Sequence, residues 1–243
     1  MPRFAVFCPA APPLPALVRL QVDAEHWLGA LKAGQERTGR EGPPVSILCD
    51  VQADGAIQVA DPQGSGVFYL RELRDPPPAA AGVRPALPAP QRAAAAPGAR
   101  AAKSLPEAAR GRYPARTEDL LLVRPGGSEL EFAVVRGPAS KRLLALRPVV
   151  PVGSGVVGYC VRENVALAVS DARNDSRFLW AIAMAIEYET RSIPCAPIAR
   201  EGKVLGALEV LNKRGRAPFC ANDLAALTAL ARHAADHLAR HGG

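Results

Sequence analysis

Aromatic residues, long apolar runs and paired cysteines are all scarce in this 243-residue chain, in which Phe, Trp and Tyr make up only 5% of the residues. No apolar run reaches the 18 residues of a membrane-spanning helix, and the first apolar run is too short for a signal peptide. The five cysteines are odd in number and never form C-x-x-C, which argues against a disulfide framework and against a zinc site. These absences predict a cytoplasmic protein with reduced thiols, without a membrane partner. The cysteines are Cys8, Cys49, Cys160, Cys195 and Cys220.

The net charge of +7 is unevenly distributed. Residues 1–73 carry −2, residues 74–116 carry +6 and residues 117–243 carry +3. A nucleic-acid-binding fold places its basic residues on a structured face, together with aromatics or a recognition helix, and neither pattern occurs here. The charge therefore indicates a basic connecting segment, and no specific nucleic-acid partner is expected.

That connecting segment has a composition of its own. Residues 75–102 contain 7 Pro and 12 Ala among 28 residues and no aromatic. Such a stretch buries too little apolar surface to offset its chain entropy. It predicts a spacer over residues 74–104, between a small module at 1–73 and a second domain at 105–243.

Residues 1–73 have the pattern of a small α+β module. Strands are expected at 17–22, 46–51, 57–59 and 67–70, separated by glycine-containing turns. Asp23 is expected to cap a helix with Trp27 on its apolar stripe, ending near Gly39 or Gly42. The predicted order is β-α-β-β-β, and Trp27 and His26 are expected in the core and on the helix surface rather than in a site.

Residues 117–243 show longer elements. A hairpin is expected at 120–135, a glycine-entered helix from about residue 155, strands near 167–169, 193–198 and 204–212, and a final helix over 222–240. The motifs along this region resemble those of the GAF domain family, in the family's order. They are Gly153, Gly155 and Gly158; Asp171; Asp175, Arg177 and Phe178; residues 190–198, reading TRSIPCAPI; Gly202 and Gly206; Asn212 and Lys213; and Phe219 with Asp223.

The resemblance implies an α+β GAF fold, a six-stranded antiparallel sheet with helices on both faces. It also implies a structural lock near the pocket, formed by Asn212, Lys213, Phe219 and Asp223. Leu224 stands where cyclic-nucleotide-binding members carry Glu, so the motif does not identify a cyclic nucleotide. The segment 174–192 is expected to build a ligand pocket, because pockets combine apolar walls with a few polar groups; filling of the interior by the same side chains is the alternative. The candidate pocket residues are Phe178, Trp180, Ile182, Ala183, Met184, Glu187, Thr190 and Ser192.

Two further groups of residues, three histidines and three cysteines, could provide a metal site or a redox site. His233, His237 and His241 share one helical stripe, a spacing that can hold a metal, but basic residues also suit a helix C-terminus, and no metal is expected. Cys160, Cys195 and Cys220 are similar in type to the cysteines of GAF-fold enzymes that reduce free methionine sulfoxide. Cys195, however, lies inside a strand that sensor members also contain, where a buried thiol is inert.

The sequence therefore predicts a bacterial signal-transduction protein that is not an enzyme and has no catalytic residues and no cofactor. Its GAF domain is expected to bind an unknown small molecule or a partner protein, and to pass the signal on through a signalling partner. The alternatives are a scaffold that only dimerises or docks, and a methionine sulfoxide reductase-like enzyme. A homodimer is expected through an apolar stripe on the last helix, although a stripe packed on its own sheet has the same pattern. The stripe comprises Leu224, Leu227, Leu230, Ala231, Ala234 and Leu238.

Overall fold

The structure is a computed structural model that describes residues 1–10, 17–40, 46–52, 55–60, 66–73, 102–103 and 115–241. The chain divides into two compact units, Met1–Val83 and Arg84–Gly243. The predicted spacer at 74–104 lies outside the described residues except for 102–103. Among the described residues, no helix combines the length and the apolar character that crossing a membrane requires.

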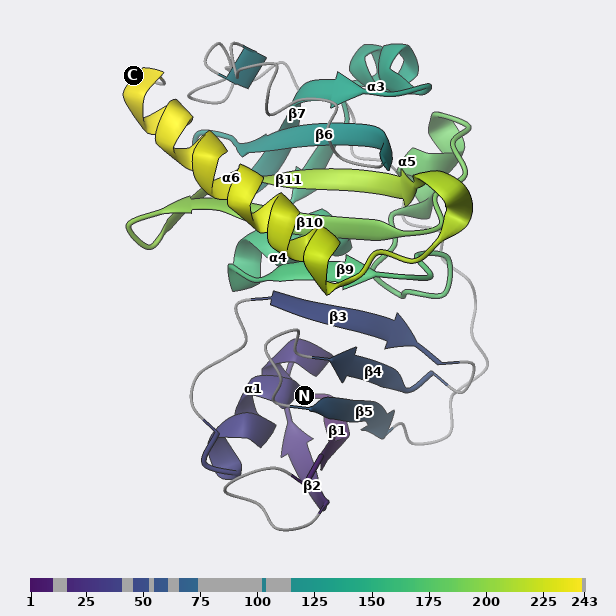
Figure 1. Cartoon of the computed structure of the whole chain (residues 1–243), viewed down its shortest axis with the longest axis vertical. Coiled ribbons are helices and arrows are strands. Elements are labelled where there is room, and N and C mark those ends of the chain that lie inside the picture. The colour runs from purple at the N-terminus through teal and green to yellow at the C-terminus, as the bar shows by residue number, and fades with distance from the viewer. Residues whose placement is uncertain are drawn as a thin grey trace. The chain divides into compact units, whose positions relative to one another are not determined.

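The first unit is an antiparallel sheet covered by one helix (Figure 1). Its strands lie in the order β2-β1-β5-β4-β3. Helix α1 packs closely on β1, since a Cβ added at Gly34 would lie 2.9 Å from Val6 Cγ1. The elements are β1 Arg3–Cys8, β2 Val18–Asp23, α1 Trp27–Arg37, β3 Ser46–Val51, β4 Ile57–Ala60 and β5 Val67–Leu73.

Two features of this unit differ from the prediction. Strand β1 was not predicted, so the order is β-β-α-β-β-β rather than β-α-β-β-β. Helix α1 is capped by His26, whose Nδ1 accepts a hydrogen bond from the Gly29 amide at 3.1 Å. Asp23 was the predicted cap, but it ends β2 and pairs with Arg3 at 3.1 Å.

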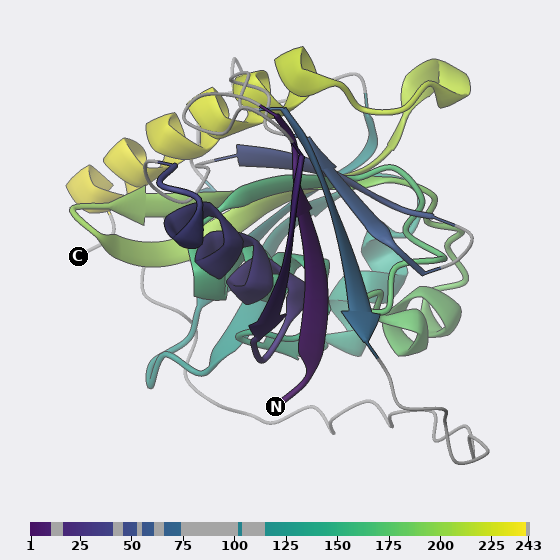
Figure 2. The same ribbon diagram turned by 90° about the horizontal axis from the view of Figure 1, so that it is seen from below.

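The second unit has an antiparallel sheet in the order β9-β10-β11-β6-β7-β8. Helix α6 lies across one face, and α3, α4 and α5 lie on the opposite face (Figures 1 and 2). The described residues thus contain more strands than the six predicted for the GAF sheet, because five further strands belong to the first unit. The elements are β6 Ala115–Val123, β7 Glu129–Arg136, α3 Ser140–Leu146, β8 Val149–Pro151, α4 Gly155–Glu163, β9 Ala166–Val169, α5 Trp180–Ala185, β10 Ile193–Arg200, β11 Lys203–Lys213, the 3₁₀ turn η2 Arg214–Arg216 and α6 Ala221–His241.

Glycines permit the close packing on which this unit depends. Gly155 opens α4 with φ +69°, and a Cβ there would lie 2.6 Å from Leu179 Cδ1. In β11, a Cβ at Gly206 would lie 2.1 Å from the backbone oxygen of Leu121 in the neighbouring strand β6. Gly155 and Gly206 therefore mark places where a side chain would collide with a neighbouring element.

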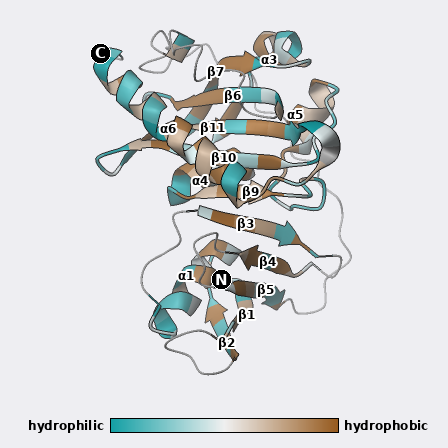
Figure 3. Ribbon diagram, in the orientation of Figure 1, coloured by the Kyte–Doolittle hydropathy of each residue, from teal (hydrophilic) through white to brown (hydrophobic). Residues whose placement is uncertain are grey.

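Helix α6 alternates hydrophilic and hydrophobic stretches along its length (Figure 3). Its apolar stripe packs against the sheet of its own unit. Leu224, Leu227, Ala231, Ala234 and Leu238 are buried, and the helix packs mainly on β10. Five of the six stripe residues are thus covered by their own sheet, and Leu230 is half-buried. This is the alternative in which the stripe packs on its own sheet; homodimerisation stays a prediction.

Candidate functional site

A cavity lies between the sheet of the second unit and the chain that covers it. Strands β6, β7 and β11 form one side, and α3, α4 and the chain from Phe178 to Thr190 form the other. Its volume is about 70 Å³, whereas one water needs about 10–15 Å³ on the same measure. It is lined by Thr117, Asp119, Phe132, Val135, Ala139, Ser140, Leu143, Val150, Val156, Val157, Phe178, Leu179, Ile182, Ala183, Ile186, Tyr188, Thr190, Ile193, Glu209 and Leu211.

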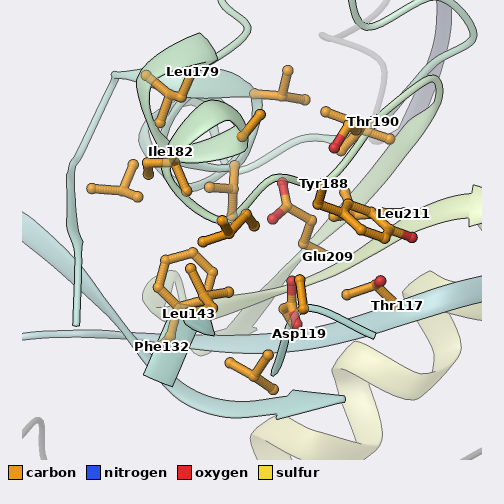
Figure 4. A pocket seen from close by; sticks show the side chains of 18 of the residues that line it. Thr117, Asp119, Phe132, Leu143, Leu179, Ile182, Tyr188, Thr190, Glu209 and Leu211 are labelled. Atoms are coloured by element: carbon orange, nitrogen blue, oxygen red, sulfur yellow. The ribbon is translucent and has the colours of Figure 1, made fainter. Parts of the chain in front are cut away.

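The cavity has a polar side and an apolar side. In Figure 4 the labelled polar side chains gather with Leu211 on one side of the view, and Phe132, Leu143, Leu179 and Ile182 gather on the other. Because β6 and β11 are antiparallel neighbours, Asp119 lies directly opposite Glu209. Like charges in directly opposite positions destabilise a sheet, so this pair is unfavourable when both groups are ionised and no cation is near.

Several polar atoms at the cavity are buried without a hydrogen-bond partner. They are Thr117 Oγ1, Asp119 Oδ1 and Tyr188 Oη. Thr117 and Asp119 are 4% and 3% exposed. Leaving such an atom unpaired costs about 1–3 kcal/mol, so each of these atoms favours an occupant that supplies a hydrogen bond.

Burial controls the ionisation of both carboxyls. It raises the pKa of Glu209 to about 7, although the Cys195 thiol donates a hydrogen bond to this carboxyl with Sγ 3.6 Å from Oε1. Burial raises the pKa of Asp119 well above its usual range; the neighbouring Glu209 adds to the rise, and a hydrogen bond from the Arg136 backbone opposes it. Near neutral pH the pair therefore holds fewer than two charges, and a cation bound between them would favour ionisation.

The eight predicted pocket residues divide into two groups. Phe178, Ile182, Ala183 and Thr190 line the cavity. Trp180, Met184, Glu187 and Ser192 lie outside this lining.

The reasons for these four exclusions are local. Trp180 and Met184 are 48% and 54% exposed on α5, a helix without buried residues. The exposed Glu187 pairs with Arg142 at 2.6 Å. Ser192 is buried beside Asn212, and its amide donates to Asn212 Oδ1 at 3.4 Å.

The predicted lock residues lie together at the end of β11 and the start of α6. Lys213 Nζ lies 2.5 Å from Asp223 Oδ2 and 6.0 Å from the centre of the Phe219 ring. Asp223 Oδ2 also accepts the Cys220 amide at 2.8 Å, as the third residue of a helix does in a capping box. Burial favours the neutral acid, but the bonds from Lys213 and Cys220 prevail and lower the pKa of Asp223.

Asn212 has a different role within the lock. Its φ is +58°, and its side chain accepts the Arg191 amide at 2.7 Å and donates to the Glu189 backbone oxygen at 2.7 Å. It therefore fastens the chain that leaves the cavity at Thr190 to the end of β11.

The other candidate residues occupy separate places. His237 and His241 stack with ring centres 4.5 Å apart, and His233 is exposed. No group of three or more His, Cys, Asp or Glu in the described ranges is arranged to hold a metal ion. Cys160 and Cys195 are fully buried, and burial raises the pKa of both thiols well above the usual range, while Cys220 is exposed.

Family comparison adds to this geometry. The chain matches the GAF domain family over residues 44–238. The chain belongs to the GAF family. The predicted family and its α+β fold are thus confirmed, and GAF domains are commonly sensory or signalling modules. The match begins well ahead of residue 105, where the sequence placed the start of the domain.

Individual relatives are distant or short matches. Over 65 residues the chain is 34% identical to the dual 3',5'-cyclic-AMP and -GMP phosphodiesterase 11A of Takifugu rubripes, covering 26% of this chain and only 7% of that protein. The type II free methionine-R-sulfoxide reductase from Thermoplasma acidophilum is 18% identical with a TM-score of 0.47, covering 59% of this chain and 96% of that one. The GAF-B domain of DevS from Mycobacterium smegmatis is 17% identical with a TM-score of 0.41, covering 59% and 88%.

One prediction is corrected by these comparisons. The sequence predicted that the chain is not an enzyme, but free methionine-R-sulfoxide reductases are among the solved structures that match it. The fold includes enzymes as well as sensors, so membership does not exclude catalysis.

The sequence reasoning missed the polar side of the cavity. Asp119 and Glu209 were not among the predicted site residues, although Glu209 is an acid with apolar neighbours on both sides in β11. An acid within an apolar run was the available signal, since an unpaired carboxylate is rarely buried. Asp119 follows Glu118 in β6, so its position gave no such signal.

Proposed function

We propose that the GAF domain is a regulatory sensor that binds a small organic molecule in the cavity and passes the signal to a partner protein. The observation that supports this most directly is the cavity itself, with apolar walls, two buried carboxyls and unpartnered polar atoms. Ligand pockets have this composition, mostly apolar with a few placed polar groups. Family membership adds the regulatory role.

Native mass spectrometry of freshly purified full-length protein tests ligand binding. We expect a mass excess that disappears on denaturation. Ala183→Leu fills part of the cavity and should reduce this excess, whereas Ala185→Leu, at an exposed position of the same helix outside the lining, should not. Equal retention in both variants would place the molecule elsewhere and contradict the proposal.

A docking scaffold is the second candidate function. Trp180, Met184 and Leu144 are large apolar side chains that remain 48%, 54% and 46% exposed, and exposed apolar patches often mark interaction sites. If self-association through this surface is the function, Trp180→Ala with Met184→Ala should lower the mass that light scattering measures at high micromolar concentration. A monomeric wild-type protein would exclude the homodimer form of this proposal.

A further inference from the structure

We propose that the cavity of this GAF domain takes a small organic cation, a protonated amine with a short apolar body, whose ammonium group lies between Asp119 and Glu209. The inference rests on the proposed function, because it specifies the chemistry of the molecule that the cavity binds. Its experiment is designed so that the two proposals succeed or fail separately.

The hydrogen-bonding groups at the cavity are acceptors that match an ammonium group. Asp119 Oδ1 and Thr117 Oγ1 are buried and unpartnered, and the Glu209 carboxyl lies opposite Asp119 on the neighbouring strand. An alkylammonium group has three N–H donors and no acceptor. Three acceptors on two adjacent strands therefore match the donors of one ammonium group.

The side chains that line the cavity are acidic or uncharged, which favours a cation. Of the described residues that line the cavity, none is Lys, Arg or His, whereas two are acids. An anion would face two carboxyls with no basic side chain to compensate, and a cation would compensate their charge. Charge-assisted bonds to buried carboxylates are also stronger than neutral ones.

The groups around the pair do not provide this compensation. Cys160 on α4 and Cys195 on β10 interact with Glu209, and both are acids with raised pKa. Glu118 is a further acid near Asp119, and Tyr188 lines the same cavity. Arg177 acts electrostatically on Cys195, and its guanidinium is bound to Asp175.

The volume limits the size of the cation. At about 70 Å³, the cavity holds about five water-sized groups. The side facing the carboxyls is formed by apolar side chains, among them Phe132, Leu143 and Ile182. A branched alkylamine of about six heavy atoms fits both the space and this apolar side.

Three probes of nearly equal shape test the inference on the full-length protein. 3-Methylbutylamine is cationic, 3-methylbutanol is neutral and 3-methylbutanoate is anionic at pH 8. Their dissociation constants are measured by NMR titration at pH 5.5 and pH 8. We expect the amine to bind at least 10-fold more tightly than either other probe at pH 8.

The pH dependence gives a second readout. Because the pKa of Glu209 is about 7, its carboxyl is largely neutral at pH 5.5 and largely ionised at pH 8. The affinity for the amine should therefore rise by about 10- to 30-fold between these values, while that for the alcohol stays flat.

Carboxamide variants assign the effect to the two acids. Glu209→Gln and Asp119→Asn should each weaken amine binding by about 10- to 100-fold. Glu201→Gln changes a carboxyl that is 83% exposed and paired with Arg200 in the turn that joins β10 and β11, and it should leave amine binding unchanged. The thermal unfolding of each variant is measured alongside, so that loss of fold is not mistaken for loss of binding.

Binding of the alcohol or of 3-methylbutanoate as tight as that of the amine overturns the inference and leaves the small-molecule sensor intact. Absence of binding by all three probes overturns it as well, and native mass spectrometry then decides the proposed function by itself. A retained molecule without a basic nitrogen supports the sensor and refutes the amine.

Discussion

Glu209 is a carboxyl whose burial makes folding stability depend on pH. Its ordinary pKa of 4.5 rises to about 7 in the folded protein. Below pH 4.5 the group is protonated in both states and its burial carries no ionisation cost. Between pH 4.5 and pH 7 the unfolded chain has released a proton that the folded protein still holds, so stability falls as the pH rises through this window and levels off above it.

The size of the effect follows from the shift. A difference of about 2.5 pKa units, at 1.36 kcal/mol per unit, corresponds to about 3 kcal/mol lost between pH 4.5 and pH 8. Glu209→Gln removes the titration and keeps the shape. We therefore expect the variant to gain about 1–3 kcal/mol relative to the wild type at pH 8, and about a quarter of that gain at pH 5.

Urea unfolding of both proteins at pH 5 and pH 8 measures this quantity. The stability difference between variant and wild type at pH 8 is compared with the same difference at pH 5, so every group that titrates equally in both proteins cancels. Glu201→Gln provides the exposed control. An equal stability change at the two pH values would refute the reasoning, because it would show that Glu209 ionises normally in the folded protein.

Three further predictions concern the structure around the site. Asp223→Ala should destabilise the protein by about 1–3 kcal/mol, Lys213→Ala by a comparable amount, and the double variant by less than their sum; strict additivity in a urea double-mutant cycle would show that the contact contributes nothing. Asn212→Ala should cost about 2–4 kcal/mol, since it loses bonds to the Arg191 amide and the Glu189 oxygen, and a midpoint equal to that of the wild type would contradict the role assigned to it. Gly206→Ala should lower the free energy of unfolding by about 1–3 kcal/mol, because the added Cβ meets the Leu121 backbone at 2.1 Å. Gly202→Ala should cost only about 1 kcal/mol, because its Cβ meets no atom within 4 Å although φ is +78°. A larger loss for Gly202→Ala than for Gly206→Ala would contradict the packing described.

The family and the lock could be predicted because the motifs that carry the resemblance to GAF domains are local in the sequence. The pairing of Lys213 with Asp223 is what that resemblance implies, and the structure brings the two together where β11 ends and α6 begins. The glycine positions are equally readable, because close approach or a positive φ requires a residue without a side chain.

The carboxyl pair could not be found in the same way. Asp119 and Glu209 lie 90 residues apart, and only the register of β6 against β11 brings them face to face. A shift of that register by one residue would turn one of the acids to the other face of the sheet. Register at this separation depends on tertiary packing, which no local pattern contains.

Two local predictions failed for identifiable reasons. The apolar run of β1 lies at the start of the chain and is followed by Pro9, and a run in that place has the pattern of a short signal-peptide core as well as that of a strand. Trp180 and Met184 are apolar and follow Phe178, but α5 has only six residues and none of them is buried. Hydrophobicity alone did not distinguish the face of α5 that lines the cavity from the face that meets solvent.

The weak anchoring of α5 has a kinetic consequence. The helix contributes Ile182 and Ala183 to the cavity wall, yet it holds little apolar surface against the remainder of the domain, and segments with few buried contacts open at a small fraction of the global unfolding free energy. We expect a bound molecule to enter and leave by local opening of this segment while the sheet stays intact. Amide hydrogen exchange in residues 180–185 should then be fast in the free protein and slow when the cavity is filled.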